Sequence, residues 1–203
     1  MPALQYDVHP GVKMIQEWVE ELPRKTGRTL QQWAELVNKL ESKVRKERIA
    51  YLKEKHGLGT NSAMHIVEYA TDSLSWDGDP AIYLQQAVKY VDGMFGGGKA
   101  ALRPIFEKVL TAARKLGKDV KVCPCKTIVP FYRNRVFAQV KPATKTRVEL
   151  GFVLKDEPFK GLLKKNPRAN EKDRIQHIIP LETPTDVTAE VLKWLKKAYD
   201  QDA

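Results

Sequence analysis

The sequence predicts an α+β protein, in which a small four-helix N-terminal unit is followed by an antiparallel sheet of about five strands packed against helices on one face. In the first part of the chain, apolar residues recur every three or four positions, which is the period of an amphipathic helix. Beyond Lys118 the period changes to two, and β-branched and aromatic residues become frequent, as is typical of strands. The turns between these strands are short and polar, so neighbouring strands are expected to be antiparallel.

The N-terminal helices are expected to lie one after another along the chain. Pro23 and Gly27 follow the first apolar pattern and are expected to end that helix. Thr29 and Gln32 have the spacing of a capping box, which predicts the start of the second helix. A third helix is expected over about 43–55, with a fourth after it. The side chains expected inside this unit are Val12, Ile15, Trp18, Val19, Leu22, Leu30, Trp33, Leu36, Val37, Leu40, Val44, Ile49, Leu52, Ala63, Ile66, Val67 and Ala70.

A domain boundary is expected near residue 75, because residues 71–80 (TDSLSWDGDP) have the Ser, Asp, Gly and Pro content of a connection. The expected domains are residues 1–75 and residues 76–203. Asp79 and Pro80 suit the N-cap and the first position of the next helix. The later elements are expected as a helix over about 100–116, strands near 119–123, 127–132, 135–141, 147–153 and 175–181, a polar loop over about 155–172 and a last helix over about 186–200.

The positive charge of the chain is concentrated in one segment. Of 203 residues, 42% are hydrophobic, which is enough for a real core, and 35 Lys and Arg against 25 Asp and Glu give a net charge of +10. Residues 99–155 contain 14 basic and 3 acidic residues, whereas the segments on either side are close to neutral. The excess therefore lies in the region of the predicted sheet, where it favours an anionic partner.

The sequence contains no sign of membrane insertion or export. No stretch approaches the ~20 apolar residues of a membrane span, and the first ten residues lack the apolar core of a signal peptide. Cys123 and Cys125 are the only cysteines, and two thiols in a chain of this length suit a reducing compartment. A cytoplasmic protein without membrane contact is expected, and its oligomeric state stays open.

Two parts of the chain resemble known families. The runs Thr26-Gly27-Arg28-Thr29-Leu30-Gln31-Gln32-Trp33 and Tyr51-Leu52-Lys53-Glu54-Lys55-His56-Gly57-Leu58-Gly59 resemble domain of unknown function 4287. From about residue 100 onward, LRPIFEKV, LGKDVKVCPCKT, FYRNRVFAQVKPATKTRVELGF and LKWLKKAYD resemble domain of unknown function 5655. Neither family has an assigned activity. Domains similar to the second occur attached to nuclease-like and restriction-associated proteins, so the resemblance favours nucleic acid.

Gly57, Gly59 and Thr60 have a spacing similar to a helix-hairpin-helix, in which a tight turn directs backbone N–H groups at a phosphate. The alternative is that these residues only cap helices, with Gly57 ending one helix and Thr60 or Asn61 starting the next. Both interpretations stay open. Because this part of the chain has almost no net charge, it would bind DNA weakly alone.

The predicted sheet offers a second anion-binding candidate. If Val136, Ala138 and Val140 face the core, strand alternation places Arg135, Phe137 and Lys141 on the other face. Cations there would meet phosphates, and an exposed ring would stack on bases. A solvated positive face is the alternative. The candidate binding residues are Lys126, Arg133, Arg135, Phe137, Lys141, Lys145 and Arg147.

No catalytic, cofactor or metal site is expected. Cys123 and Cys125 lack the partner cysteines of a zinc site, even with His56, His65 and His177 considered. The acidic residues Glu107, Asp119 and Glu149 do not form a nuclease pattern. The leading hypothesis is a non-catalytic nucleic-acid or polyanion binding module. The alternatives are an interaction module for an acidic protein, or an enzyme that acts on a small anionic substrate between the sheet and residues 155–172.

Overall fold

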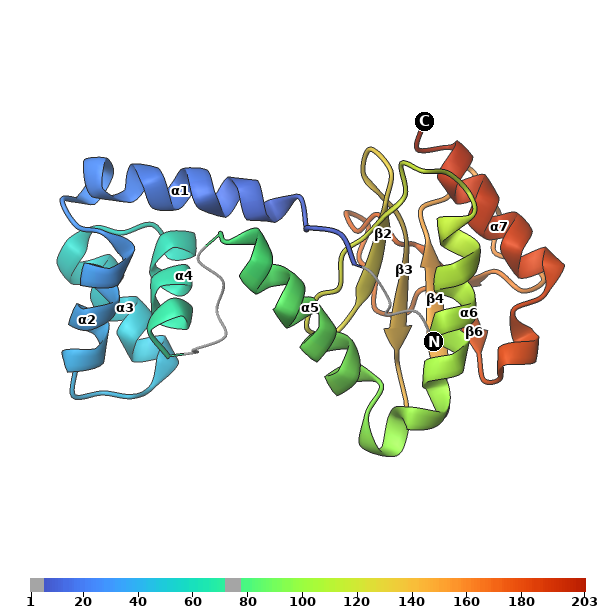
Figure 1. Cartoon of the computed structure of the whole chain (residues 1–203), viewed down its shortest axis with the longest axis horizontal. Helices are drawn as coiled ribbons and strands as arrows, with labels where there is room; N and C mark the ends of the chain where they lie inside the picture. The colour runs from blue at the N-terminus through green and yellow to red at the C-terminus, as the bar shows by residue number, and fades with distance from the viewer. Residues whose placement is uncertain (1–5, 72–77) are drawn as a thin grey trace. The chain divides into compact units, whose positions relative to one another are not determined.

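The computed structural model describes residues 6–71 and 78–203 (Figure 1), so part of the connection expected at residues 71–80 lies outside the described residues. The predicted α+β class is confirmed. The helices are α1 Gly11–Thr26, α2 Leu30–Lys39, α3 Arg45–His56, α4 Thr60–Thr71, α5 Pro80–Met94, α6 Arg103–Arg114 and α7 Ala189–Asp200, with short 3-10 turns η1 Gly97–Leu102 and η2 Pro184–Asp186. The strands are β1 Lys121–Val122, β2 Val129–Tyr132, β3 Val136–Pro142, β4 Val148–Phe152, β5 Lys164–Lys165 and β6 His177–Leu181.

The chain divides into two compact units. The described residues between 10 and 83 form one unit, and residues 6–9 together with residues 84–203 form the other. The segment before α1 thus packs within the sheet-containing unit. There, the Asp7 N–H donates to the Val122 carbonyl (2.9 Å) and the Asp7 carboxylate pairs with Arg114 (2.6 Å). No pattern in the sequence indicates this contact, because it joins segments more than one hundred residues apart.

In the first unit, helices α1 to α4 enclose an apolar core. Leu22, Trp33, Leu52 and Ile66 are among its buried side chains, as predicted. Helix α1 runs through Pro23 and ends only at Gly27, whose backbone is left-handed (φ 73°), so the predicted effect of Pro23 on the helix is wrong. The Thr26 hydroxyl donates to the Leu22 carbonyl (2.7 Å) and supports the last turn. Pro23 lacks the N–H of one helical hydrogen bond, and the helix nevertheless continues for three more residues.

The capping box of α2 is confirmed. The Gln32 N–H donates to the Thr29 hydroxyl (3.2 Å), and the Thr29 N–H donates to the Gln32 side-chain oxygen (2.8 Å). Val44, expected in the core, is 55% exposed, because it lies at the N-cap of α3 and not within the helix.

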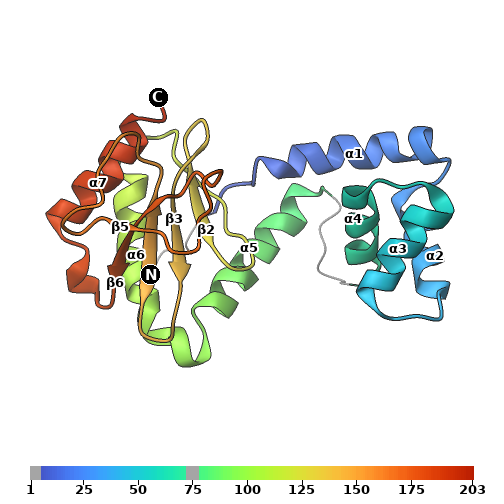
Figure 2. The ribbon, with the colours of Figure 1, turned by 180° about the vertical axis from the view of Figure 1, so that it is seen from behind.

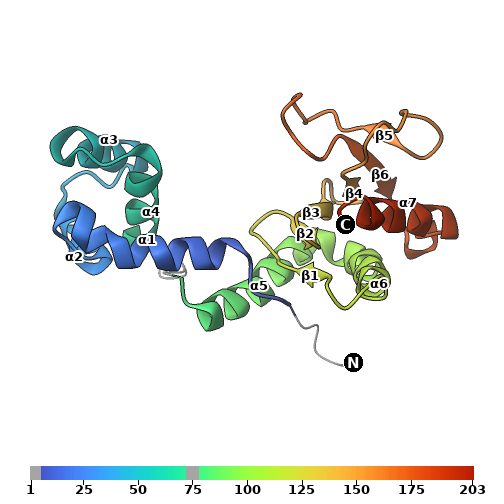
Figure 3. The same ribbon diagram turned by 90° about the horizontal axis from the view of Figure 1, so that it is seen from above.

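The second unit contains a six-stranded antiparallel sheet in the order β1-β2-β3-β4-β6-β5. Figures 2 and 3 show this sheet from behind and from above, with α6 and α7 on one face. The buried core between the helices and the sheet includes Phe106 of α6, Leu195 of α7 and Leu150 of β4. The short strand β5 lies in the segment expected as a loop, and it pairs with β6.

A bulge in β3 changes the position of Phe137. Phe131 pairs with Ala138 and Tyr132 pairs with Val136, so Phe137 is an extra residue between these two pairs. Its side chain is completely buried, and its ring packs edge-on against Tyr199 of α7 (5.6 Å between centroids). The expectation that Phe137 faces away from the core is therefore wrong, because the bulge interrupts strand alternation.

The face opposite α6 and α7 is partly covered by the segment that follows β4. Gln139, Lys141 and Glu149 face this side, yet Glu149 is only 5% exposed. Arg168 from this segment reaches the Glu149 carboxylate (2.5 Å), and Ile175 packs against Gly151. The sheet is therefore open over only a part of this face.

None of the helices within the two described ranges combines the length and the apolar character needed to span a bilayer.

Candidate anion-binding groove

A groove of about 580 Å³ lies at one end of the sheet, and four lysines line it. Lys99 comes from η1, Lys126 precedes β2, Lys141 lies on β3, and Lys145 lies in the β3–β4 turn. The residues that line the groove include no Asp or Glu. The antiparallel register explains the convergence, because the start of β2, the end of β3 and the β3–β4 turn all lie at the same end of the sheet.

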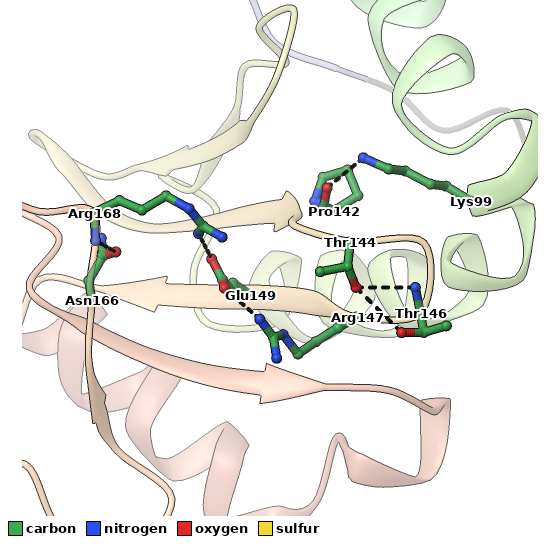
Figure 4. A network of polar contacts seen from close by, with 8 residues as sticks. All are labelled: Lys99, Pro142, Thr144, Thr146, Arg147, Glu149, Asn166 and Arg168. Atoms are coloured by element: carbon green, nitrogen blue, oxygen red, sulfur yellow. Dashed lines mark hydrogen bonds and ion pairs between the residues drawn. The ribbon is translucent and has the colours of Figure 1, made fainter.

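Lys99 fixes the turn after α5 to this end of the sheet. Its ammonium donates to the Pro142 carbonyl (2.8 Å; Figure 4), which leaves two of its three donors available. Gly97 before it has a left-handed backbone (φ 53°), which allows the tight turn after Phe95. Gly98 lies beside the aliphatic part of the Lys145 side chain. A Cβ added to Gly98 would lie 3.7 Å from the Lys145 Cδ. This is an ordinary van der Waals distance, so the position of Lys145 does not require glycine at residue 98.

The other three lysines have no acidic partner among residues 6–71 and 78–203. Within the described part of the chain, the side chains of Lys126, Lys141 and Lys145 make no hydrogen bond or ion pair. The Cα of Lys141 is paired with that of Glu149, but the Glu149 carboxylate is already bound by Arg168 (2.5 Å) and Arg147 (3.4 Å; Figure 4). The charge of Lys141 is therefore available to an external anion.

Arg147 pairs with Glu149 and is not among the residues that line the four-lysine groove. Its Nη2 pairs with buried Glu149, while its Nε is buried and finds no hydrogen-bond partner among the described residues. A buried carboxylate is stabilised only when its charge is compensated, so Arg147 and Arg168 hold Glu149 in place. Arg147 is therefore paired with a carboxylate of the protein itself, although 38% of its side chain is exposed.

Arg133 and Arg135 lie at the opposite end of β3. Arg133 pairs with Asp119 (2.8 Å), and its guanidinium lies over the Tyr199 ring (4.4 Å). The hydrogen bond from the Tyr199 hydroxyl, and to a lesser extent the one from Arg133, holds the pKa of the Asp119 carboxyl below its usual value. Arg135 is exposed and lines a different depression. The structure therefore brings Lys126, Lys141 and Lys145 together with Lys99, and separates them from the two arginines.

Lys99 was not among the candidates from the sequence. The run Gly96-Gly97-Gly98-Lys99 lacks the spacing of a Walker motif, so the sequence alone gives no reason to place Lys99 at an anion site.

The cavity between the sheet and residues 155–172 is small. Its volume is about 40 Å³, and Gln139, Lys141, Glu149, Asn166 and Arg168 are among its lining residues. This is room for a few water molecules at most.

The cysteines and histidines do not converge on a metal site. Among the described residues, no group of three or more His, Cys, Asp or Glu could hold a metal ion. His56 packs edge-on against Trp33 and His65 against Trp18, each at 5.1 Å between ring centroids. Burial raises the pKa of the Cys123 thiol to about 12. This thiol is therefore protonated at neutral pH and is a poor nucleophile.

In the first unit, Gly57 and Gly59 lie between α3 and α4. Gly57 has a left-handed backbone (φ 66°) and caps α3, with its N–H bonded to the Lys53 carbonyl (3.0 Å). Gly59 precedes Thr60, the first residue of α4, and its carbonyl accepts from the Ala63 N–H (2.9 Å). Gly57 is thus the C-cap of α3, as the capping alternative predicts, but Gly59 and not Thr60 or Asn61 occupies the N-cap position of α4. Phosphate binding at Gly57, Gly59 and Thr60 stays a prediction.

Gly57→Ala is expected to lower the stability of the first unit by roughly 1–2 kcal/mol, since a Cβ is strained in the left-handed region. Gly59 has no left-handed backbone, and an added Cβ would meet nothing within 4 Å. Gly59→Ala should therefore cost less than about 1 kcal/mol, the usual cost of alanine at an N-cap. Urea unfolding of both variants tests the difference. Equal losses would contradict the assigned roles.

These features describe an α+β protein with a helical N-terminal unit and a lysine-lined groove on a six-stranded antiparallel sheet. The chain belongs to the family described as Domain of unknown function (DUF5655), whose model matches residues 91–202. The model described as Domain of unknown function (DUF4287) matches residues 14–72, so the resemblance and its order are confirmed. Searches of curated proteins and of solved structures found no match.

Proposed function

We propose that the sheet-containing unit binds the phosphate backbone of nucleic acid through the groove of Lys99, Lys126, Lys141 and Lys145. The observation that supports this most is the convergence of four lysines without an acidic residue among the groove-lining residues. Four ammonium groups close together repel one another, and phosphate oxygens would relieve this repulsion.

The chemistry of the groove favours contacts that do not depend on base sequence. Lysine acts as a compact point charge, whereas sequence is read by groups that match base edges, such as the planar fork of arginine. Lysine contacts to phosphates position a protein on nucleic acid without carrying sequence information. With Phe137 buried, no aromatic stacking is expected from β3. The proposed activity is therefore non-specific binding that depends strongly on salt.

The salt dependence of DNA binding tests this proposal. If the four lysines each neutralise one phosphate, the plot of log K against log salt for a random-sequence duplex should have a slope of about −3.6. Affinity should fall roughly 150-fold between 50 and 200 mM salt. Fluorescence anisotropy of the full chain with a labelled duplex measures both quantities.

Small anions provide the control for this titration. Inorganic phosphate and pyrophosphate should compete only at millimolar concentration, because each presents few of the charges that the groove accommodates. A wild-type chain without measurable DNA affinity at 50 mM salt would contradict the proposal. Tight pyrophosphate binding in that case would favour the small anionic ligand.

A further inference from the structure

Helices α6 and α7 lie next to each other on one face of the sheet (Figure 1). The residues that line a second groove come from these two helices and from the residues just after α6. Its volume is about 760 Å³. Its floor is formed by Ala112 of α6, by Leu116 just after α6, and by Leu192 and Leu195 of α7. Leu195 is fully buried, whereas Ala112, Leu116 and Leu192 are half-buried and exposed to the groove. The floor is therefore an apolar surface that the chain itself leaves incompletely covered.

The rim of this groove is strongly basic. Lys108 and Lys115 stand on the α6 side, and Lys193 and Lys196 stand on the α7 side. Glu107 is the one acidic residue among those that line the groove, and Arg103 pairs with it (3.1 Å). Lys196 pairs with Asp200 (2.6 Å), and Lys108 donates to the neutral Pro184 carbonyl (2.8 Å). The rim thus keeps an excess of positive charge on both sides of an apolar floor.

A ligand that covers this groove must place apolar groups on the floor and negative charges at the rim. A nucleic-acid backbone would neutralise the lysines, but it has no apolar side to cover the floor. A second copy of this groove would place lysines against lysines, because a two-fold interface brings the same patch of both copies together. An amphipathic segment of a protein satisfies both features, with apolar side chains on the floor and carboxylates at the rim.

We propose that the α6–α7 groove binds an acidic amphipathic helix of a partner protein. Its apolar residues, at positions i, i+3 or i+4, and i+7, contact Ala112, Leu116 and Leu192. Aspartates and glutamates on both sides of that apolar stripe pair with the rim lysines. Because this groove and the four-lysine groove share no residue, the inference does not depend on the proposed binding of nucleic acid.

Three synthetic helical peptides of equal length test the proposal with the full-length chain. The first has a leucine stripe flanked by glutamates, the second has the same stripe flanked by lysines, and the third has serines in place of the leucines. Only the first is expected to bind with micromolar affinity. Amide NMR shifts should then be largest around Leu116 and Leu192. Equal binding of the lysine-flanked peptide, or no binding of the first peptide, would overturn the proposal.

Charge-reversal variants locate the site. The double variant Lys115→Glu/Lys193→Glu should weaken binding of the first peptide by about tenfold or more. The matched control Lys160→Glu/Lys172→Glu makes the same charge change at exposed residues of the segment after β4, and should leave the affinity unchanged. Ala112→Gln fills part of the floor without changing charge and should also weaken binding. Circular dichroism establishes that each variant is folded.

Two outcomes would assign this surface to another ligand. If Lys115→Glu/Lys193→Glu weakened duplex binding and left peptide affinity unchanged, the surface would be part of a nucleic-acid site. If the first peptide bound equally well to wild type and to both double variants, its binding would lie elsewhere. Either result would overturn the assignment of an acidic helix to this groove.

Discussion

Phe137→Ala is expected to lower the free energy of unfolding of the sheet-containing unit by about 3–5 kcal/mol, the usual cost of removing a fully buried phenylalanine ring. The ring has no exposed surface, and it contacts Tyr199 of α7 on the core side of the sheet. Its removal leaves a cavity between β3 and α7 that this packed core cannot close. Urea unfolding followed by circular dichroism measures the loss.

The DNA affinity of the same variant separates two roles for this ring. A core residue affects binding only through the folded fraction, so folded Phe137→Ala at low temperature should bind single strands as wild type does. Phe137→Leu keeps most of the buried volume and should lose much less stability. A stable Phe137→Ala variant with weakened single-strand binding would instead show that the ring reaches bases.

Local signals in the sequence predicted most of the secondary structure. The capping box at Thr29 and Gln32 starts α2, and Gly57 ends α3, because each depends on neighbouring residues only. The change of hydrophobic period after Lys118 also depends on residues close together in the chain, and it correctly predicted where the sheet begins. Four of the five predicted strands correspond to β2, β3, β4 and β6, and the first is the two-residue β1.

Features that depend on distant residues could not be predicted in this way. The bulge at Phe137 exists only in the pairing of β3 with β2, so alternation along β3 alone gave the wrong face. Strand β5 has two exposed lysines, and only its pairing with β6 makes it a strand. Helix α1 continues past Pro23 to Thr26 and ends where Gly27 adopts a left-handed backbone, so the glycine and not the proline marks its end.

The sequence predicted three of the four lysines in the candidate groove, and strand geometry explains why the other predicted residues lie elsewhere. Arg135 and Lys141 were expected on one face, but six residues of extended strand separate them by roughly 20 Å. A single compact ligand cannot contact both ends. Lys99 joins the groove by the fold of the turn after α5, which no spacing along the chain indicates. The charge of the segment 99–155 therefore located the region, and the strand register determined which cations converge.

The double variant Lys126→Glu/Lys145→Glu is expected to weaken duplex binding by about a hundredfold or more at 50 mM salt, because two phosphate contacts are lost and counterion release falls accordingly. The slope of log K against log salt should change from about −3.6 to about −1.8. Both side chains are exposed and make no ion pair in the described part of the chain, so stability should hardly change.

The variant Lys115→Glu/Lys193→Glu is the control for net charge, because it makes the same change in charge at the α6–α7 groove. If only total charge mattered, both double variants would lose equal affinity for the duplex, because long-range attraction is not specific to a site. Direct phosphate contacts in the four-lysine groove require a much larger loss for Lys126→Glu/Lys145→Glu. Near-equal losses at physiological salt, where screening removes most long-range attraction, would exclude this groove as the binding site.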